Sequence, residues 1–374
     1  MPHSLARFIQ LNRKDVVMTT QPTVEASAPD PAVIELGLDT FGDVTRDASG
    51  ARLSDAQTIR NVVEQAVLAD RVGLSFFGVG EHHRPEFAVS SPEIVLAAAA
   101  ARTERIRLGT AVTVLSSDDP VRVYERFATL DAVSNGRADV ILGRGSFIES
   151  FPLFGYDLRD YETLFDEKLD LFSQLLTEKP VTWQGTLRAG LTDADVFPKT
   201  ENGLRAWVGV GGTPESVVRA ARYGYGLMLA IIGGPAARFR PFADLYRRSL
   251  TTFERAQLPV GVHSPGHIAD SDQEAWDEAY EGFEAMNNTI GRERGWPSYN
   301  RLRFQHDVGP DGALYVGSPD TVARKIVDTV RTLGAARFDM KFSTGTLSHE
   351  KLMRSIELYG TEVAPRVHRM LAQA

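Results

Sequence analysis

The stretch Phe76-Phe77-Gly78-Val79-Gly80-Glu81-His82-His83-Arg84-Pro85-Glu86-Phe87 joins an apolar run to an acid and two adjacent histidines. The apolar run is typical of a buried β-strand that ends abruptly at Glu81. In parallel α/β barrels, the carboxyl ends of the strands carry the catalytic residues. The two imidazoles are therefore candidates for chemistry, although such a pair is also compatible with one hydrogen-bonded wall residue and one solvated residue.

Strand patterns and helix patterns alternate on both sides of this stretch. We predict strands at 33–39, 74–79, 106–115, 138–142, 206–210, 226–232, 260–269 and 337–342. Helix starts lie between them, such as Ser54 with Gln57 in a capping box and Ser91 followed by Pro92. Strict alternation implies parallel strands joined by right-handed crossovers. Eight such units in 374 residues indicate an α/β fold, a single (β/α)₈ TIM barrel with insertions, rather than a doubly wound sheet.

Three regions depart from this alternation. We expect residues 1–32 to be a disordered lead-in, with Met18 as a second candidate start, and residues 33–374 to form the barrel. The range 183–204 is interpreted as an inserted hairpin. The range 288–315 is interpreted as irregular and, because it is too long for a plain connection, as a candidate lid.

The composition excludes several classes of protein. The net charge is -8 and no run of lysine and arginine is present, which argues against nucleic acid and anionic membranes as partners. The absence of cysteine excludes disulfides, thiolate nucleophiles and cysteine metal sites. No apolar stretch is long enough to span a bilayer and no secretory signal is found, so the expected location is cytoplasmic.

Metal and serine-hydrolase chemistry lack their usual patterns. The histidine pair at 82–83 does not have the helical spacing of zinc ligands. His263 and His267 are interpreted as flanking a Ser-Pro-Gly turn without an evident carboxylate partner. No G-x-S-x-G nucleophile elbow occurs. We therefore expect no metal site.

Glycine-rich strand ends give two candidate anion sites. Gly143-Arg144-Gly145 follows the predicted fourth strand, and Val210-Gly211-Gly212-Thr213-Pro214-Glu215-Ser216 joins the fifth strand to a helix start. A similar order recurs in Val316-Gly317-Ser318-Pro319-Asp320-Thr321. Each could be a plain turn or helix cap. Phosphate sites after the last barrel strands favour the second copy, but only the first copy has an arginine, Arg144, at the adjoining strand end.

At this point the chain resembles the bacterial luciferase-like flavin-dependent monooxygenases over about residues 34–371. The resemblance is carried by seven segments in family order: Gly80-Glu81-His82-His83 with Glu86-Phe87; Leu108-Gly109-Thr110-Ala111-Val112; Asp119-Pro120-Val121-Arg122; Leu130-Asp131 with Ser134-Asn135-Gly136-Arg137; Gly143-Arg144-Gly145; Val316-Gly317-Ser318-Pro319; and Glu362-Val363-Ala364-Pro365.

The resemblance implies an FMN site at the carboxyl face of the barrel. Arg144 matches the family's phosphate-binding arginine, and Gly211, Gly212, Thr213 and Ser216 match its phosphate loop and helix start. Thr110 and Ala111 match strand positions beside the flavin ring, where a cis Ala111–Val112 bond is expected. His82 matches the histidine near the reactive edge of the flavin.

The implied function is that of a flavin-dependent monooxygenase. It would take reduced FMN from a separate reductase and use O₂, through a flavin peroxide, to oxygenate a small organic substrate. His82 is the candidate acid or base, since imidazole titrates near neutral pH. A homodimer is expected. Gly143 stands where luciferase has a reactive cysteine, and a luciferase tryptophan is replaced around Ile231, so light emission is not implied.

Two alternatives remain open at this point. One is a reductase or dehydrogenase on the same fold that transfers hydride with a deazaflavin cofactor. The other is a flavin-binding protein without turnover, against which the two histidines and Arg144 argue only weakly. The substrate cannot be predicted, because loop shape rather than fold determines pocket specificity.

Overall fold

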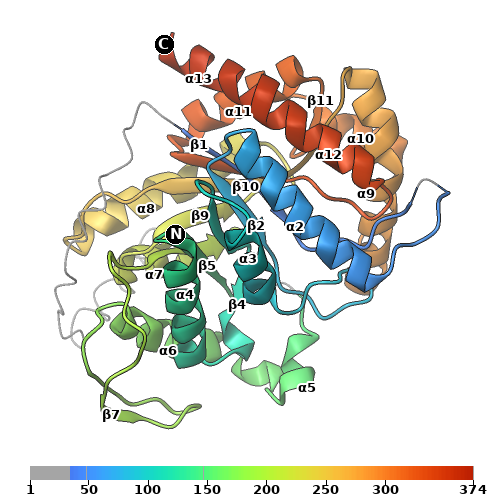
Figure 1. Cartoon of the computed structure of the whole chain (residues 1–374). Coiled ribbons are helices and arrows are strands. Elements are labelled where there is room, and N and C mark those ends of the chain that lie inside the picture. Colours follow the sequence, from blue (N-terminus) through green and yellow to red (C-terminus); the bar gives the residue numbers. More distant parts are fainter. Residues whose placement is uncertain (1–33, 48, 146, 374) are drawn as a thin grey trace.

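The computed structural model describes residues 34–47, 49–145 and 147–373 (Figure 1). The expected lead-in at 1–32 lies outside these residues. Within them, parallel strands close into a barrel. In order around it these are β1 (Glu35–Thr40), β2 (Phe76–Val79), β3 (Arg107–Thr110), β5 (Ala138–Gly143), β8 (Arg205–Val210), β9 (Gly226–Ala230), β10 (Val260–Ile268) and β12 (Arg337–Lys341). Since β12 pairs with β1, the predicted TIM barrel is confirmed.

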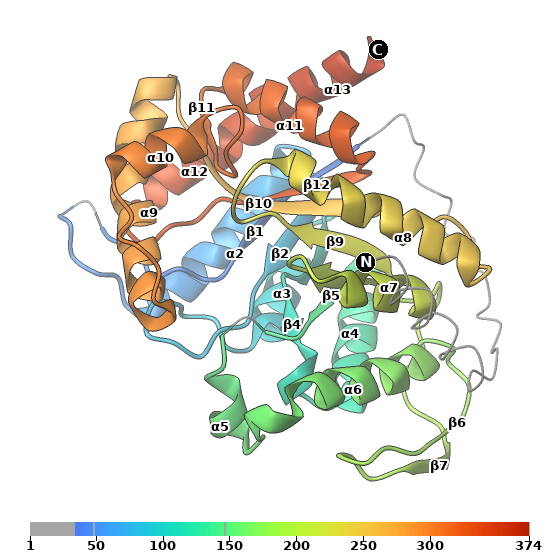
Figure 2. The ribbon, with the colours of Figure 1, turned by 180° about the vertical axis from the view of Figure 1, so that it is seen from behind.

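Helices cover the outside of the barrel on all sides (Figures 1 and 2). They are α2 (Asp55–Arg71), α3 (Pro92–Ala100), α4 (Pro120–Ser134), α5 (Ser150–Phe154), α6 (Tyr161–Leu175), α7 (Pro214–Tyr223), α8 (Arg240–Thr252), α9 (Asp272–Arg294), α10 (Arg301–Val308), α11 (Pro319–Leu333), α12 (His349–Leu358) and α13 (Ala364–Ala372). The predicted cap at Ser54 forms, whereas the Ser91 side chain makes no cap hydrogen bond at the start of α3. The Ser54 hydroxyl accepts a hydrogen bond from the Gln57 N–H at 3.1 Å, which satisfies one of the free amides of α2.

Short elements complete the chain. They are β4 (Thr113–Val114), β6 (Val181–Trp183), β7 (Leu191–Ala194), β11 (Tyr315–Gly317), the 3₁₀ turns η1 (Leu115–Ser117), η2 (Leu158–Asp160) and η3 (Ala236–Phe239), and the π-helical turn η4 (Tyr359–Val363). The antiparallel pair β6–β7 confirms the predicted inserted hairpin. No helix among the described residues is long and apolar enough to cross a membrane.

A buried ionic group fills the amino end of the barrel. Arg337, at the start of β12, is fully buried and its guanidinium lies 3.5 Å from the centre of the Phe76 ring. It donates hydrogen bonds to Asp139 Oδ2 at 2.8 Å and to both oxygens of Asp339. Burying charges is costly unless they are paired in this way. The amino end of the barrel is thus occupied by paired side chains, which fits a ligand site at the carboxyl ends of the strands.

The interpretation of 288–315 as irregular is wrong for 288–294 and 301–308, which are helical, whereas 295–300 and 309–314 lack regular secondary structure. Helix α9 continues to Arg294 and ends at Gly295, whose φ of +68° fits a left-handed cap. Helix α10 then packs back onto α9, and Phe283, Tyr299 and Phe304 share a small hydrophobic core with them. The local sequence did not reveal these helices, because their apolar residues are buried against each other rather than against the barrel.

Two strand interpretations are also corrected. The predicted strand at 106–115 is interrupted: β3 ends at Thr110, a cis Ala111–Val112 bond follows as the resemblance implied, and β4 pairs separately with β5. His263 and His267 do not flank a turn. Both lie within β10, which continues through Pro265 because the strand also pairs with β11 beyond that point.

Candidate active site

The His82 side chain lies at the carboxyl mouth of the barrel in an aromatic pocket. The residue follows the end of β2, and its backbone N–H donates to the Val89 carbonyl at 3.1 Å. Ring centroids of Phe41, Phe87 and Phe147 lie 4.7, 4.4 and 5.1 Å from the imidazole centroid. Three elements far apart in sequence therefore place one imidazole against an apolar wall.

The protonation of His82 differs from the sequence-based expectation. Burial of the ring, and then the positive charge of Lys341 and the neighbouring His83 and Arg84, lower the pKa of His82 to about 3. The direction of this shift favours a neutral imidazole at physiological pH, whereas the sequence alone suggested one that titrates near neutrality; the role of His82 as acid or base stays a prediction. A neutral ring can still donate one hydrogen bond and accept another, but it lacks the second proton of an imidazolium.

The neighbouring residues Glu81 and His83 hold the site together. One Glu81 oxygen lies 2.9 Å from His83 Nε2, and the other accepts the Val114 N–H at 3.1 Å. The end of β2 is thereby fixed to β4, directly after Ala111 and Val112. His83 also packs edge-on against Phe154 at 5.0 Å. This agrees with a supporting role for His83, which stays a prediction.

Glycines make room for the backbone at Ala111 and Val112. A Cβ atom on Gly143 would lie 2.4 Å from Val112 Cγ2, and one on Gly80 would lie 2.9 Å from the Ala111 carbonyl oxygen. Gly143 therefore gives room to the Val112 side chain. Thr110 is fully buried and its hydroxyl lies 2.8 Å from the Thr113 hydroxyl, so its place beside a flavin ring stays a prediction.

The predicted phosphate residues come together at the start of α7. Arg144 follows β5, and its Nη2 donates to the Thr213 hydroxyl at 3.5 Å. The Thr213 hydroxyl in turn donates to Ser216 Oγ at 2.7 Å. The Thr213 side chain does not cap the helix backbone, contrary to the expected N-cap. A Cβ atom on Gly211 or Gly212 would meet nothing within 4 Å, so this corner is open to a ligand.

The second candidate anion site, at the start of α11, is filled by the chain itself. Ser318 caps the helix by accepting from the Thr321 N–H. One oxygen of Asp272 accepts from the Ser318 N–H at 2.6 Å, and the other accepts from the Thr321 hydroxyl at 3.0 Å. A carboxylate thus already occupies the position that a phosphate would take. This finding supports the preference for the α7 start.

Sequence analysis missed a pair of residues at the same mouth, Asp39 and His263. Asp39 is 1% exposed at the end of β1, and its Oδ2 lies 2.7 Å from His263 Nδ1 on β10. Burial acts to lower the pKa of His263, but the Asp39 carboxylate raises it overall. The Phe41 ring is nearly parallel to the His263 ring at 6.1 Å. Sequence analysis missed the pair because the two residues are 224 positions apart and no local pattern joins them.

A further polar group lies beside this pair. Lys341 Nζ donates to Asp43 Oδ1 at 2.6 Å and lies 4.9 Å from the centre of the Phe41 ring. Phe41 therefore contacts His82 on one side and has His263 and Lys341 close by. Among the described residues, no group of three or more histidines and carboxylates is arranged to hold a metal ion.

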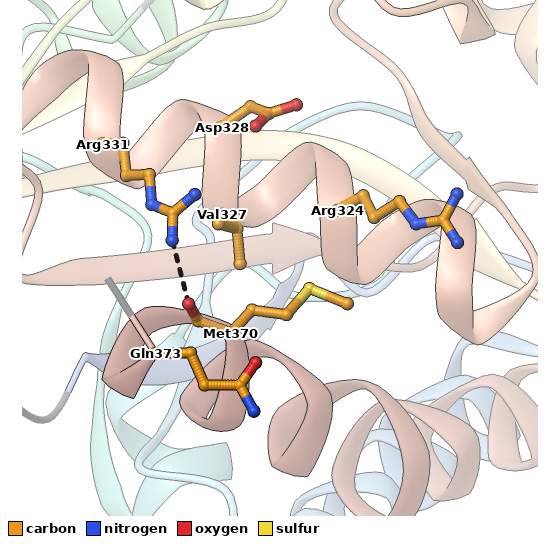
Figure 3. Close-up of a pocket in the computed structure, with 6 residues that line it drawn as sticks. All are labelled: Arg324, Val327, Asp328, Arg331, Met370 and Gln373. Atoms are coloured by element: carbon orange, nitrogen blue, oxygen red, sulfur yellow. Dashed lines mark hydrogen bonds between the residues drawn. The ribbon is translucent and has the colours of Figure 1, made fainter.

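A separate hollow lies between α11 and α13 (Figure 3). It is lined by Arg324, Val327, Asp328, Arg331, Met370 and Gln373. Arg331 Nη2 donates to the Met370 carbonyl there at 2.9 Å. None of the predicted site residues lines this hollow, and both helices lie outside the barrel. We do not assign it to the active site.

Comparison with known proteins defines the class. The family model for luciferase-like monooxygenases matches residues 40–337, so the chain belongs to that family and is a flavin- or deazaflavin-dependent oxidoreductase. It is 30% identical over 325 residues to 4-hydroxyprotoasukamycin monooxygenase of Streptomyces nodosus subsp. asukaensis, a match that covers 83% of this chain and 87% of the relative.

Two solved structures share the fold. One is the oxygenating constituent of 3,6-diketocamphane monooxygenase of Pseudomonas putida in complex with FMN, with a TM-score of 0.72, 20% identity, and coverage of 90% of this chain and 99% of that one. The other is a coenzyme F420-dependent tetrahydromethanopterin reductase of Methanopyrus kandleri, with a TM-score of 0.67, 19% identity, and coverage of 90% and 99%. At these identities the likeness concerns the fold alone.

Proposed function

We propose that this protein is an FMN-dependent monooxygenase that oxygenates a small organic substrate with O₂. The observation that carries the proposal is the open anion corner formed by Arg144, Gly212, Thr213 and Ser216 at the same barrel mouth as His82. The monooxygenase relative and the FMN complex of a structural neighbour support this choice of cofactor and reaction.

The residues present fit FMN. Arg144 offers a charge-assisted donor to a phosphate, the hydroxyls of Thr213 and Ser216 add two donors, and the amides of the α7 start point to the same corner. The backbone at Ala111 and Val112 would lie beside the ring system. When bound, the reduced flavin supplies the two electrons that allow one oxygen atom of O₂ to enter the substrate and the other to leave as water.

The contribution of the protein is a dry and oriented pocket. Phe41, Phe87 and Phe147 place apolar surface around the partly buried His82 ring, and this burial favours the neutral imidazole. His82 would then hold a proton at one ring nitrogen and accept a hydrogen bond at the other. It would orient a reacting group by hydrogen bonding rather than act as a protonated general acid.

The end of α9 reaches this pocket. Arg84 Nη1, next to the histidine pair, donates to Glu293 Oε2 at 3.0 Å, and the Arg294 guanidinium lies 5.3 Å from the centre of the Phe147 ring. We propose that residues 288–300 cover the mouth as a lid, in place of the irregular segment expected from the sequence. A separate flavin reductase, a homodimer and a cytoplasmic location remain part of the proposal.

The test compares the two cofactors. Flavin fluorescence and absorbance titrations would give the dissociation constants for FMN and F420, and rapid mixing of the reduced FMN complex with O₂ would give the rate of oxygen consumption. We expect micromolar or tighter FMN binding and oxygen consumption faster than that of free reduced FMN. Preferential binding of F420 with oxygen-insensitive hydride transfer would overturn the proposal. FMN binding without faster turnover would favour the non-catalytic alternative.

A variant at the histidine refines this test. His82→Ala should bind FMN within about threefold of the wild type, because the imidazole does not contact the phosphate corner, but should change the oxygen reaction by tenfold or more. His306→Ala, an exposed histidine on α10, is the matched control. An unaltered oxygen reaction in His82→Ala would leave this histidine as a wall residue.

A further inference from the structure

A second arginine faces the anion corner at the start of α7. Arg219 lies one turn after Ser216 on that helix, and its Nη1 donates to Ser216 Oγ at 3.5 Å. Its side chain is only 14% exposed and packs over the Phe165 ring at 5.6 Å. Nothing in the sequence pattern singled out this residue. Arg144 and Arg219 therefore reach the same pair of hydroxyls from two different elements.

The Arg219 guanidinium is held in place from the opposite side. Asp166 on α6 accepts at 2.5 Å from Arg219 Nε. This contact uses Nε of the guanidinium, so that Nη1 faces Ser216 and Nη2 faces Glu162. An arginine that is fixed in this way loses little conformational entropy when it binds an anion.

A carboxylate of the protein lies between the two arginines. Glu162, in the first turn of α6, pairs through one oxygen with Arg144 Nη1, and its other oxygen lies 3.7 Å from Arg219 Nη2. The Glu162 side chain is 61% exposed, whereas those of Arg144 and Arg219 are 23% and 14% exposed. The group between the two cations is thus the most exposed of the three and the easiest to displace.

We propose that Arg219 is a second phosphate ligand of the cofactor site and that Glu162 is an internal carboxylate that the phosphate displaces. The inference rests on the proposed FMN site and adds to it the way in which phosphate binding is tuned. A phosphate dianion can accept from both guanidinium groups and both hydroxyls at once, whereas a carboxylate has only two oxygens. Glu162 keeps the two arginines apart and neutralised until the phosphate arrives, and it weakens phosphate binding by competing with it.

The experiment measures the contribution of the phosphate to binding separately from that of the rest of the cofactor. Titrations with FMN and with riboflavin, which lacks the phosphate, would be followed by flavin fluorescence for the wild type, Glu162→Gln and Arg219→Gln. We expect Glu162→Gln to tighten FMN binding about threefold to tenfold and Arg219→Gln to weaken it about tenfold. Neither variant should change riboflavin binding. High salt should reduce both effects.

Matched controls test whether charge alone accounts for the result. Arg222→Gln removes a positive charge from the same helix, and Glu281→Gln removes an exposed carboxylate from α9; both should leave FMN binding unchanged. Arg219→Lys keeps the charge without the fork and should give a smaller loss than Arg219→Gln, which provides a second variant if Arg219→Gln does not fold. Equal effects on FMN and riboflavin, or weaker FMN binding in Glu162→Gln, would overturn the inference.

Inorganic phosphate distinguishes this inference from the proposed function. If the wild type does not bind FMN, the proposed function fails. The anion site is then tested by calorimetric titration with inorganic phosphate, which Glu162→Gln should bind more tightly and Arg219→Gln less tightly than the wild type. Absence of phosphate binding to the wild type, or phosphate binding that is the same in all three proteins, would overturn the anion site as well.

Discussion

The starts of α7 and α11 share a sequence pattern but differ in what lies beside them. Each has a glycine, a hydroxyl residue, proline, an acid and, after the acid, another hydroxyl residue: Gly212 to Ser216 in one and Gly317 to Thr321 in the other. At α11, the Asp272 carboxylate binds the Ser318 N–H and the Thr321 hydroxyl. At α7, the hydroxyls bond to each other, two arginines approach, and the glycines face open space.

The difference shows that a helix start is a general anion site whose use depends on its neighbours. Both starts expose amide N–H groups and the positive end of a helix dipole. At one start the Asp272 carboxylate, which accepts two hydrogen bonds, links α9 to α11. The other start has cations and no buried carboxylate, so it has the properties of a ligand site. Four predictions test this distinction.

The largest effect is expected at Arg144. Arg144→Ala removes a charge-assisted donor, which is worth roughly 1.5–3 kcal/mol, so FMN affinity should fall about tenfold or more in fluorescence titrations. Arg324→Ala is the matched control, because Arg324 lies on α11 and pairs only on the surface with Asp320. Equal FMN affinity in wild type and Arg144→Ala would show that the α7 start is not the phosphate site.

The second effect concerns Asp272 at the other helix start. Asp272→Ala leaves the Ser318 N–H and the Thr321 hydroxyl without their acceptor, so the free energy of unfolding should fall by about 1–3 kcal/mol. Urea denaturation measures this loss. FMN affinity should stay within twofold of the wild type. A large loss of FMN binding in a folded Asp272→Ala protein would contradict the separation of the two sites.

The third prediction compares the hydroxyl residues directly. Ser318→Ala removes an N-cap hydrogen bond and should destabilise the protein by about 1 kcal/mol without an effect on FMN binding. Thr213→Val removes no cap and should change stability by less than about 0.5 kcal/mol, but should weaken FMN binding about threefold. Thermal unfolding and FMN titration of both variants measure the two effects. The reverse pattern would exchange the roles of the two helix starts.

The smallest effect is a dependence of stability on pH. Burial acts to raise the pKa of Asp272, but hydrogen bonds from Ser318 and Thr321 lower it overall. A carboxyl group with a lowered folded-state pKa stabilises the protein above its unfolded-state pKa, and this stabilisation is lost as the pH falls through the folded-state value. The stability difference between wild type and Asp272→Asn should therefore shrink on acidification below about pH 4. A constant difference from pH 7 to pH 3 would contradict this assignment.

The fold could be predicted largely from local pattern. Each predicted strand of the barrel has a counterpart in the structure, and the starts at Ser54 and Pro120 lie where the sequence placed them. Such signals are encoded within about ten neighbouring residues, by apolar periodicity and by capping side chains. The helices within 288–315 were missed because their apolar side chains are buried against each other and not against the barrel.

The candidate site likewise combines residues that the sequence predicted with features that it did not predict. Arg144, Thr213 and Ser216 were predicted by motif, and the structure brings them together. Three features were not predicted: the lowered pKa of His82, the Asp39–His263 pair and the Asp272 carboxylate. These depend on partners that are distant in sequence: His263 is 224 positions from Asp39, and Ser318 is 46 positions from Asp272.

The sequence by itself therefore determined the barrel and the family, and it pointed to the residues proposed to bind a phosphate. Only the tertiary structure decided which helix start is open, because Asp272 fills one and Glu162 lies exposed between the two arginines beside the other. The physical reason is that secondary structure follows from contacts between near neighbours in the chain. Protonation and the occupancy of a helix start follow instead from burial and charge, which the packing of distant segments creates.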